Sequence, residues 1–251
     1  MNKTASDIKK INILGVPVDM VSNSQALELF EAFLETDELS FIATPNPEII
    51  LAAQKDEQIA EVIKSADLKL PDGTGIVKAS AILGQPLSER VTGIDFTYAA
   101  LQRLAKAGGS VFLLGSKPGI AEKAAAKLVE QIPSLRIAGY RDGYFKSFEE
   151  DEVVNEINDS GADMLCTALG APKQEFFIYR HRDELKAKVA IGIGGSLDVW
   201  SGTLNRAPQF YIDHNIEWVY RLKQEPARIK RIWKLPLFLI KIYIQRGKNG
   251  N

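Results

Sequence analysis

Short apolar runs alternate with longer amphipathic segments along most of the chain. An apolar run of four to eight residues bounded by Gly, Pro, Asn or Asp is typical of a buried β-strand. The runs that predict strands are 11–18, 40–44, 68–70, 110–114, 135–140, 164–168 and 189–193.

The segments between these runs carry apolar residues at the spacing of an α-helix. In the first, Ala26, Leu27, Phe30 and Leu34 predict a helix over 24–34, with Ser22 or Ser24 as its N-cap. The remaining predicted helices are 47–64, 94–106, 120–131, 148–158 and 172 to about 185.

This alternation predicts an α/β fold that is Rossmann-like, with a largely parallel sheet and helices on both faces. Gly, Asn and Pro interrupt the pattern near residues 200–210, where the charge balance also changes. We therefore expect an α/β domain over 1–202 and a basic helical C-terminal appendage over 203–251.

The composition of the 251-residue chain, 45% hydrophobic and 25% charged, is that of a globular protein with one sizeable core. Its one cysteine, Cys166, excludes an internal disulfide, and its two histidines disfavour a multi-histidine metal site. The first ten residues lack the apolar stretch of a signal peptide, and no apolar run approaches the roughly 20 residues of a membrane-spanning helix. We expect a cytoplasmic protein that needs no cofactor.

The net charge of −1 conceals an asymmetry between the two parts of the chain. From Arg221 onward nine Lys or Arg residues face one acid, Glu225, so this part carries +8 and the preceding residues −9. A basic tail on an acidic body indicates an anionic partner for the tail, with a solvated basic helix as the alternative.

Five polar loops each follow a predicted strand. Ligands of open α/β sheets bind beyond the carboxyl ends of the strands, so these loops predict a binding site at one edge of the sheet. Each loop taken alone is also consistent with ordinary turn chemistry. The loops are 44–48, 71–75, 115–119, 170–175 and 194–198.

The loop that contains Gly115 and Ser116 leads from a strand into a helix, where backbone amides and the helix dipole favour a phosphate. It matches neither a P-loop nor the dinucleotide fingerprint. The stretch at Gly192 to Gly194 also fails that fingerprint, because Leu197 stands where its third glycine is required. A nicotinamide oxidoreductase is therefore disfavoured.

Three side chains in the loops are candidates for chemistry. Asp72, between Pro71 and Gly73, is a candidate general base or a turn-forming residue. Gln174 lies on the first turn of a helix, if Pro172 begins it, and either points into the cleft or caps the helix. Asp198 either accepts from a nucleotide or serves as an N-cap.

The chain has no Asp-x-Asp pair with which to hold a divalent cation on a diphosphate. Arginine is the natural substitute for such a cation. Arg228 and Arg231 are three residues apart and share a helix face, whereas Pro226 prevents the spacing from placing Arg221 on that face.

The tail over 229–246 carries a six-residue apolar run with Trp233 and Tyr243 on either side and Lys or Arg throughout. This pattern is typical of a basic segment that lies in the headgroup region of an anionic membrane. The alternatives are a core helix or a dimerisation helix, so a homo-oligomer stays open. Nucleic acid is disfavoured because the body is acidic.

Taken together, these loops and the tail resemble the WecG/TagA/CpsF family of bacterial glycosyltransferases over about residues 11–235. Each motif is weak alone, but their joint order is specific. Leu197 departs from the family pattern, since many members carry an aromatic residue there. The matching stretches are 44–48, 71–75, 90–93, 169–175, 194–198 with Gly202, 206–208, 217–222 and 225–228 with Arg231.

The resemblance implies an inverting, metal-independent transfer of N-acetylmannosamine from a UDP-sugar donor to a polyprenyl-diphosphate-linked GlcNAc acceptor, as in wall teichoic acid linkage-unit synthesis. It implies an enzyme on the inner face of the cell membrane, with Asp72 as the general base. Arg221, Arg228 and Arg231 would close over the site and stabilise the leaving diphosphate. The expected pocket and nucleotide residues are Thr44, Asn46, Arg90, Gly115, Ser116, Gln174, Gly194, Gly195 and Asp198.

Several alternatives stay open at this point. A related transferase could use another UDP-sugar, such as the uronate of N-acetylmannosamine or glucose. A sugar-nucleotide epimerase or oxidoreductase would carry bound NAD, and a non-enzymatic membrane scaffold would release no UDP.

Overall fold

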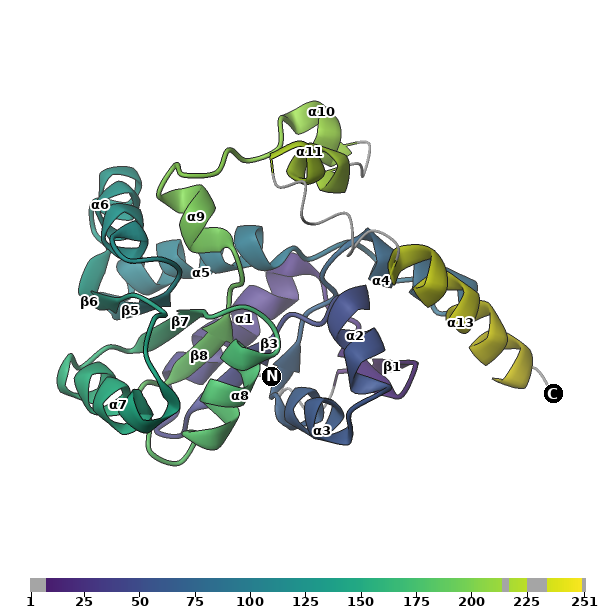
Figure 1. Ribbon diagram of the computed structural model, residues 1–251, viewed down its shortest axis with the longest axis horizontal. Helices are drawn as coiled ribbons and strands as arrows, with labels where there is room; N and C mark the ends of the chain where they lie inside the picture. The colour runs from purple at the N-terminus through teal and green to yellow at the C-terminus, as the bar shows by residue number, and fades with distance from the viewer. Residues whose placement is uncertain (1–7, 214–216, 225–233, 250–251) are drawn as a thin grey trace.

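The centre of the molecule is a sheet of six parallel strands, seen in a computed structural model that describes residues 8–213, 217–224 and 234–249 (Figure 1). The strand order is β4-β3-β8-β7-β5-β6, and every neighbouring pair runs parallel. The parallel α/β architecture expected from the sequence is therefore confirmed. The strands are β3 (Ser40–Ala43), β4 (Leu68–Lys69), β5 (Ser110–Gly115), β6 (Arg136–Arg141), β7 (Met164–Ala168) and β8 (Val189–Gly192).

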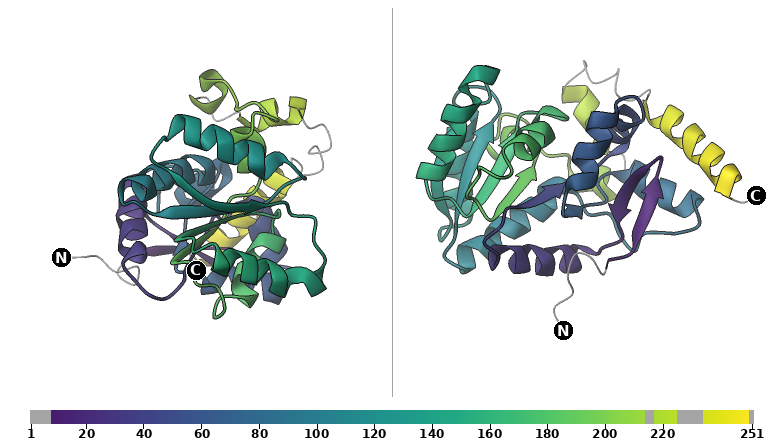
Figure 2. Two further views of the ribbon diagram at one scale, coloured as in Figure 1. Left: turned by 90° about the vertical axis from the view of Figure 1, so that its left-hand side faces the viewer. Right: turned by 90° about the horizontal axis from the view of Figure 1, so that it is seen from below.

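Helices connect successive strands and cover both faces of the sheet (Figure 2). In α1, Ser22 is the N-cap and forms a capping box with Gln25, as the pattern of the sequence predicts. The helices are α1 (Asn23–Leu34), α2 (Pro47–Ala53), α3 (Glu57–Ser65), α4 (Thr74–Ile82), α5 (Gly93–Lys106), α6 (Ile120–Gln131), α7 (Glu150–Asp159), α8 (Lys173–Arg180), α9 (Ser196–Trp200), α10 (Gln209–Asp213), α11 (Glu217–Gln224) and α13 (Lys234–Asn249).

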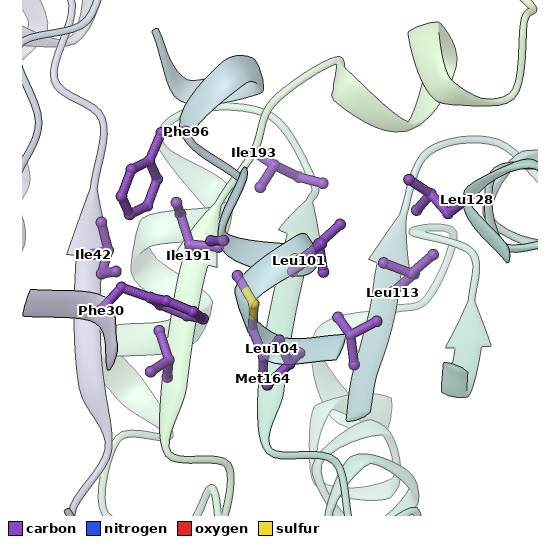
Figure 3. Close-up of a cluster of buried hydrophobic side chains, with 14 of the residues drawn as sticks. Phe30, Ile42, Phe96, Leu101, Leu104, Leu113, Leu128, Met164, Ile191 and Ile193 are labelled. Atoms are coloured by element: carbon purple, nitrogen blue, oxygen red, sulfur yellow. The ribbon is translucent and has the colours of Figure 1, made fainter. Parts of the chain in front are cut away.

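Two apolar cores lie against the two faces of the sheet, because successive side chains of a strand point to opposite faces. In β3, Ile42 belongs to the core formed with α1, α5 and α6, whereas Phe41 and Ala43 belong to the core formed with α2, α3, α7 and α8. Figure 3 shows the first core, where Phe30 and Phe96 meet edge to face with ring centroids 6.4 Å apart. Burial on both faces explains why the strands are apolar runs without alternation.

The prediction of a single strand over 11–18 is wrong. The segment folds back on itself as an antiparallel hairpin of β1 (Lys10–Ile13) and β2 (Val16–Asp19), separate from the main sheet. The chain reverses at Leu14 and Gly15, whose φ angles are 52° and 90°. Two central residues with positive φ suit the right-handed twist of a two-residue hairpin.

The helical predictions also need three corrections. The segment expected as one helix over 47–64 is two helices, because the Asp56 side chain accepts from the amide of Gln58 and starts α3 anew. The sequence analysis did not predict α4, whose N-cap is Gly73 at φ 87° without a side-chain cap. Pro172 precedes α8 as its N-cap and is not its first residue.

The C-terminal helices attach to the body in different places. Helices α10 and α11 lie together, whereas α13 packs on α2 and α4 and projects from the end of the molecule opposite β6 (Figure 1). Phe238 and Ile242 of α13 are fully buried in the second core. None of the helices in the described part of the chain has the length and hydrophobicity that crossing a membrane requires.

Candidate functional site

The five polar loops lie at the carboxyl edge of the sheet, as the sequence predicts. They follow β3, β4, β5, β7 and β8, and all of these strands run parallel. All five loops lead directly into helices, so their backbones and first-turn side chains gather above neighbouring strand ends. This edge is the candidate active site.

Asp72 and Thr44 converge on Gly93, the first residue of α5. A methyl group built on Gly93 would lie 3.2 Å from Thr44 Cγ2 and 3.7 Å from Asp72 Oδ2. Thr44 Oγ1 also donates to the carbonyl of Gly192 at 3.3 Å, which ties the ends of β3 and β8 together. Asp72 is partly exposed at this edge.

Asn46 has a structural task in the same loop. Its Oδ1 accepts from the amides of Glu48 at 2.9 Å and Ile49 at 3.2 Å, and so caps α2. Pro47 then begins the helix and packs on Gly75 of α4, where any side chain would overlap its ring. The cap fixes the position of the β3 loop beside the Asp72 loop.

Gln174 joins the loop after β7 to the loop after β8. Its side chain is buried, and Oε1 accepts from the amide of Gly194 at 3.1 Å. Nε2 donates to Glu175 Oε1 at 2.8 Å and lies so close to Gly192 that a Cβ there would overlap it. Gly194, at φ 52°, precedes Gly195, the N-cap of α9. The side chain of Gln174 thus bridges two loops of the site.

Ser116 and Asp198 form the third contact between loops. Ser116 Oγ donates to Asp198 Oδ1 at 3.0 Å, joining the loop after β5 to α9. The amide of Ser116 donates to the Ala168 carbonyl at 3.0 Å, so it is not one that the loop can offer to a phosphate. At Gly115, with φ 129°, a Cβ would run into the backbone of Ala168. This close approach requires glycine.

A cavity of about 480 Å³ adjoins the Ser116 loop. The amide of Gly143 donates to the Ser116 carbonyl at 2.9 Å, which places the cavity beside Gly115 and Ser116. No role was predicted for the residues that line this cavity, although two aromatic residues followed by a lysine after a strand, Tyr144 to Lys146, are a usable signal. The lining residues are Gly143, Tyr144, Phe145, Lys146, Leu169 and Lys173.

Arg90 links the site to the C-terminal helices. Its guanidinium pairs with Glu217 of α11, Nη2 to Oε2 at 3.1 Å, and both side chains are only 17% exposed. A second ion pair, between Arg206 and Asp95, ties the segment before α10 to the first turn of α5. Both pairs meet the body beside Thr92 and Gly93, close to Asp72.

Three arginines were expected to close over the site, and the structure describes only the backbone of one of them. Arg221 lies in α11, but its side chain is outside the described part of the structure. Arg228 and Arg231 lie outside the described residues altogether. Their role stays a prediction.

The structure also shows where Leu197 lies. Leu197, the departure from the family pattern, is fully buried in the first core, so it contacts the core helices.

Among the described residues, one set of three potential metal ligands has its ligand atoms within 4.8 Å of one another: Asp151, His181 and Glu184. These residues come from α7 and the segment after α8, and not from the five loops.

Comparison with known proteins identifies relatives of this chain. A sequence model described as the glycosyl transferase WecG/TagA/CpsF family matches residues 11–251. The N-acetylglucosaminyldiphosphoundecaprenol N-acetyl-beta-D-mannosaminyltransferase of Bacillus spizizenii is 38% identical over 231 residues, which are 92% of this chain and 89% of the relative. The protein of the same name from Staphylococcus aureus (strain MRSA252) is 36% identical over 239 residues, 94% and 93% of the two chains. The Bacillus subtilis (strain 168) protein of that name is 38% identical over 208 residues, 83% and 80% of the two chains.

Proposed function

The chain belongs to the WecG/TagA/CpsF family of glycosyl transferases, and on that premise we propose that it is an N-acetylmannosaminyltransferase. The donor is UDP-N-acetylmannosamine, and the acceptor is the N-acetylglucosamine of a polyprenyl diphosphate, in wall teichoic acid linkage-unit synthesis. The names of the relatives support the transferred sugar and the acceptor.

The convergence of Asp72 and Thr44 on Gly93 carries the proposal for the chemistry. In a single displacement the acceptor hydroxyl attacks C1 of the donor sugar, the bond from C1 to the UDP oxygen breaks, and UDP leaves as an anion. Asp72 takes the proton of the attacking hydroxyl as general base. One displacement inverts C1, so the expected product is the β-glycoside if the donor is α-linked.

The cavity beside Ser116 supports a seat for the nucleotide. The Tyr144 side chain is 70% exposed, which leaves its ring face available for stacking on uracil. Lys146 and Lys173 border the same cavity and attract a diphosphate. We expect Asp198, which accepts from Ser116, to accept from the ribose as well.

Stabilisation of the departing UDP falls to arginines of the C-terminal region, without a metal ion. Asp72 and Asp198 follow β4 and β8, which are separated by β3 in the sheet, so two strand spacings, roughly 10 Å, lie between the two loops. That separation does not suit two carboxylates on one cation. Transfer activity is therefore expected to persist in EDTA.

The outer face of α13 supports a peripheral position on the cytoplasmic face of the membrane. Phe238 and Ile242 face the body, and four large apolar side chains on the same helix remain 46–59% exposed. Arg246 and Lys248 are exposed on the same helix and favour anionic headgroups, whereas Lys234 and Lys241 contact Glu48 and Gln54 of the body. The exposed side chains are Leu237, Ile240, Tyr243 and Ile244.

Substitution of Asp72 tests the assignment of the base. Loss of a positioned general base costs about 10²- to 10⁴-fold in rate, so Asp72→Asn should lower kcat by that factor and leave the affinity for UDP near the wild-type value. The measurements are UDP release with a short-chain prenyl-diphosphate acceptor and calorimetric binding of UDP. Asp37→Asn, a change of the same kind at an exposed position before β3, is the control. Wild-type turnover by Asp72→Asn would remove Asp72 from the mechanism.

A panel of UDP-sugars tests the donor. UDP release with UDP-N-acetylmannosamine and none with its uronate or with UDP-glucose is the expected result. A preference for one of the other donors would favour the related transferase of a different surface polysaccharide.

A further inference from the structure

Glu175 is a buried carboxyl group that the transfer chemistry proposed above leaves without a task. It lies in the first turn of α8 and is 3% exposed. Oε1 accepts from Gln174 Nε2 at 2.8 Å. Oε2 is also buried and has no hydrogen-bond partner among the described residues.

The fold gains little from this carboxyl group. Burial raises the pKa of Glu175 above its ordinary value of 4.5, because a charged group is poorly solvated inside the protein. An acid in the first turn of a helix gains a small stabilisation from the helix dipole. An unpaired polar atom in the interior costs more than that gain, so the balance is unfavourable. An apolar side chain of similar length would suit the packing at least as well.

What Glu175 does supply is an acceptor that orients the Gln174 amide. A glutamine amide fits its surroundings in two orientations that exchange oxygen and nitrogen. The Glu175 carboxyl oxygen on one side and the Gly194 amide on the other select the orientation with nitrogen toward Glu175. Nε2 has two N–H groups, and Glu175 takes one of them.

We propose that Glu175 is a positioning residue whose carboxyl oxygen holds the Gln174 amide so that its second N–H binds the sugar nucleotide. The same contact keeps the loops after β7 and β8 in register, because Gln174 bridges to Gly194 and packs on Gly192. The carbonyl of Gly192 in turn accepts from Thr44. The orientation of the Gln174 amide therefore affects the position of the loop that faces Asp72. The inference rests on the proposed function.

Two substitutions at Glu175 separate positioning from packing. Glu175→Gln keeps an acceptor for Gln174 and should retain kcat/KM for the donor within about threefold of wild type. Glu175→Met fills similar space without an acceptor and should lower donor kcat/KM about tenfold or more, with the acceptor KM unchanged. Glu57→Met, at an exposed first-turn acid of α3, controls for loss of charge at a helix N-terminus.

Thermal unfolding distinguishes the two roles, because replacing a residue that only stabilises the packing would lower the Tm. Since the folded pKa of Glu175 is raised, its ionisation costs stability above pH 4.5, and the cost disappears as the pH falls through the raised pKa to that value. Glu175→Met should therefore have a Tm equal to or above wild type at pH 7, with the difference shrinking toward pH 4.5. A lower Tm together with wild-type kcat/KM would make Glu175 a packing residue and overturn the proposal.

A double-mutant cycle completes the test. In a Gln174→Ala background, Glu175→Met should cause no further loss, because Glu175 acts through Gln174. An equal loss in both backgrounds would overturn the proposal. If Glu175→Met does not fold, the pH–rate profiles of wild type and Glu175→Gln decide: profiles that coincide from about pH 6 to about pH 8 support a role as an acceptor that needs no carboxylate charge, and displaced profiles contradict the proposal.

Turnover by the wild-type enzyme distinguishes failure of the proposed function from failure of the role proposed for Glu175. A wild-type enzyme that releases no UDP with any donor contradicts the proposed function. A wild-type enzyme that turns over, with Glu175→Met equally active, contradicts only the role of Glu175.

Discussion

Helices α11 and α13 both belong to the basic C-terminal region, but they are held to the body by different forces. In α13, Phe238 and Ile242 are fully buried in a core of the α/β fold. None of the side chains that the structure describes in α10 and α11 is buried, and α11 reaches the body through the ion pair of Glu217 with Arg90. Apolar burial is insensitive to salt, whereas ion pairs near the surface are weak and screened.

This difference gives the two helices different roles: α13 is firmly attached to the body, and α11 is the candidate for closing over the site. The sequence analysis treated 203–251 as one appendage that both completes the site and binds the membrane. In the structure, α13 is a fixed part of the body, whereas α11 reaches the body through the Arg90–Glu217 ion pair among the side chains that the structure describes. We predict that a step that brings Arg221 of α11 over the diphosphate would break that ion pair.

The largest expected effect is on the docking of α13. Phe238→Ala should lower the free energy of unfolding by about 3–5 kcal/mol, because it empties a fully buried site in the core. Urea denaturation followed by circular dichroism measures it. Leu237→Ala, one residue away and 46% exposed, is the control and should cost less than about 1 kcal/mol. Equal costs for the two variants would mean that α13 is not anchored by its inner face.

An intermediate effect is expected on the outer face of α13. Replacing Leu237 and Ile240 together by Ser should weaken binding to vesicles with anionic lipid by about 2 kcal/mol, roughly 30-fold, since each side chain contributes part of its transfer free energy. Vesicle sedimentation measures it, and Val129→Ser, at an exposed apolar position of α6, is the control. Unchanged vesicle binding would contradict a membrane role for this face.

The smallest effect on stability is expected at α11. Glu217→Gln should change the free energy of unfolding by less than about 1 kcal/mol, because it removes one ion pair near the surface. Limited trypsin digestion should nevertheless cleave within residues 206–224 faster, and 1 M NaCl should have the same effect on wild type. Glu31→Gln, which removes the exposed Arg103–Glu31 pair elsewhere, should leave that cleavage unchanged. If trypsin cleaves Glu217→Gln in this segment no faster than wild type, contacts other than the ion pair hold α11 to the body.

The sequence predicts best those features that a local pattern encodes. The limits of α6 and the N-cap of α1 follow from apolar spacing and one serine. The carboxyl-edge location of the loops follows from the parallel strands, which the alternation of elements predicts. The β1–β2 turn was missed because Leu14-Gly15 is not a common hairpin pair, and α4 because its start resembles a loop.

The site contacts could not be predicted because they depend on neighbours distant in sequence or on unusual local geometry. Arg90 and Glu217 are 127 residues apart, and no pattern pairs them. Gln174 and Glu175 are adjacent, and adjacent residues of a helix do not normally face each other. The tail shows the opposite difficulty: apolar residues on both sides of α13 are consistent with a core helix and with a membrane helix, and the structure has features of both.

Gly75 has a consequence for the geometry of transfer at a lipid surface. Its lack of a side chain lets Pro47 of α2 and Leu235 of α13 approach α4 together; a Cβ there would come within 2.9 Å of Leu235. The three helices are thus clamped at one point, immediately after the loop that carries Asp72. With 16 residues, α13 is a rod about 24 Å long. If the outer face of that rod rests in the headgroups as proposed, the clamp would set the height and tilt of the Asp72 carboxylate above the bilayer, within the short reach that a diphosphate gives to a lipid-tethered sugar.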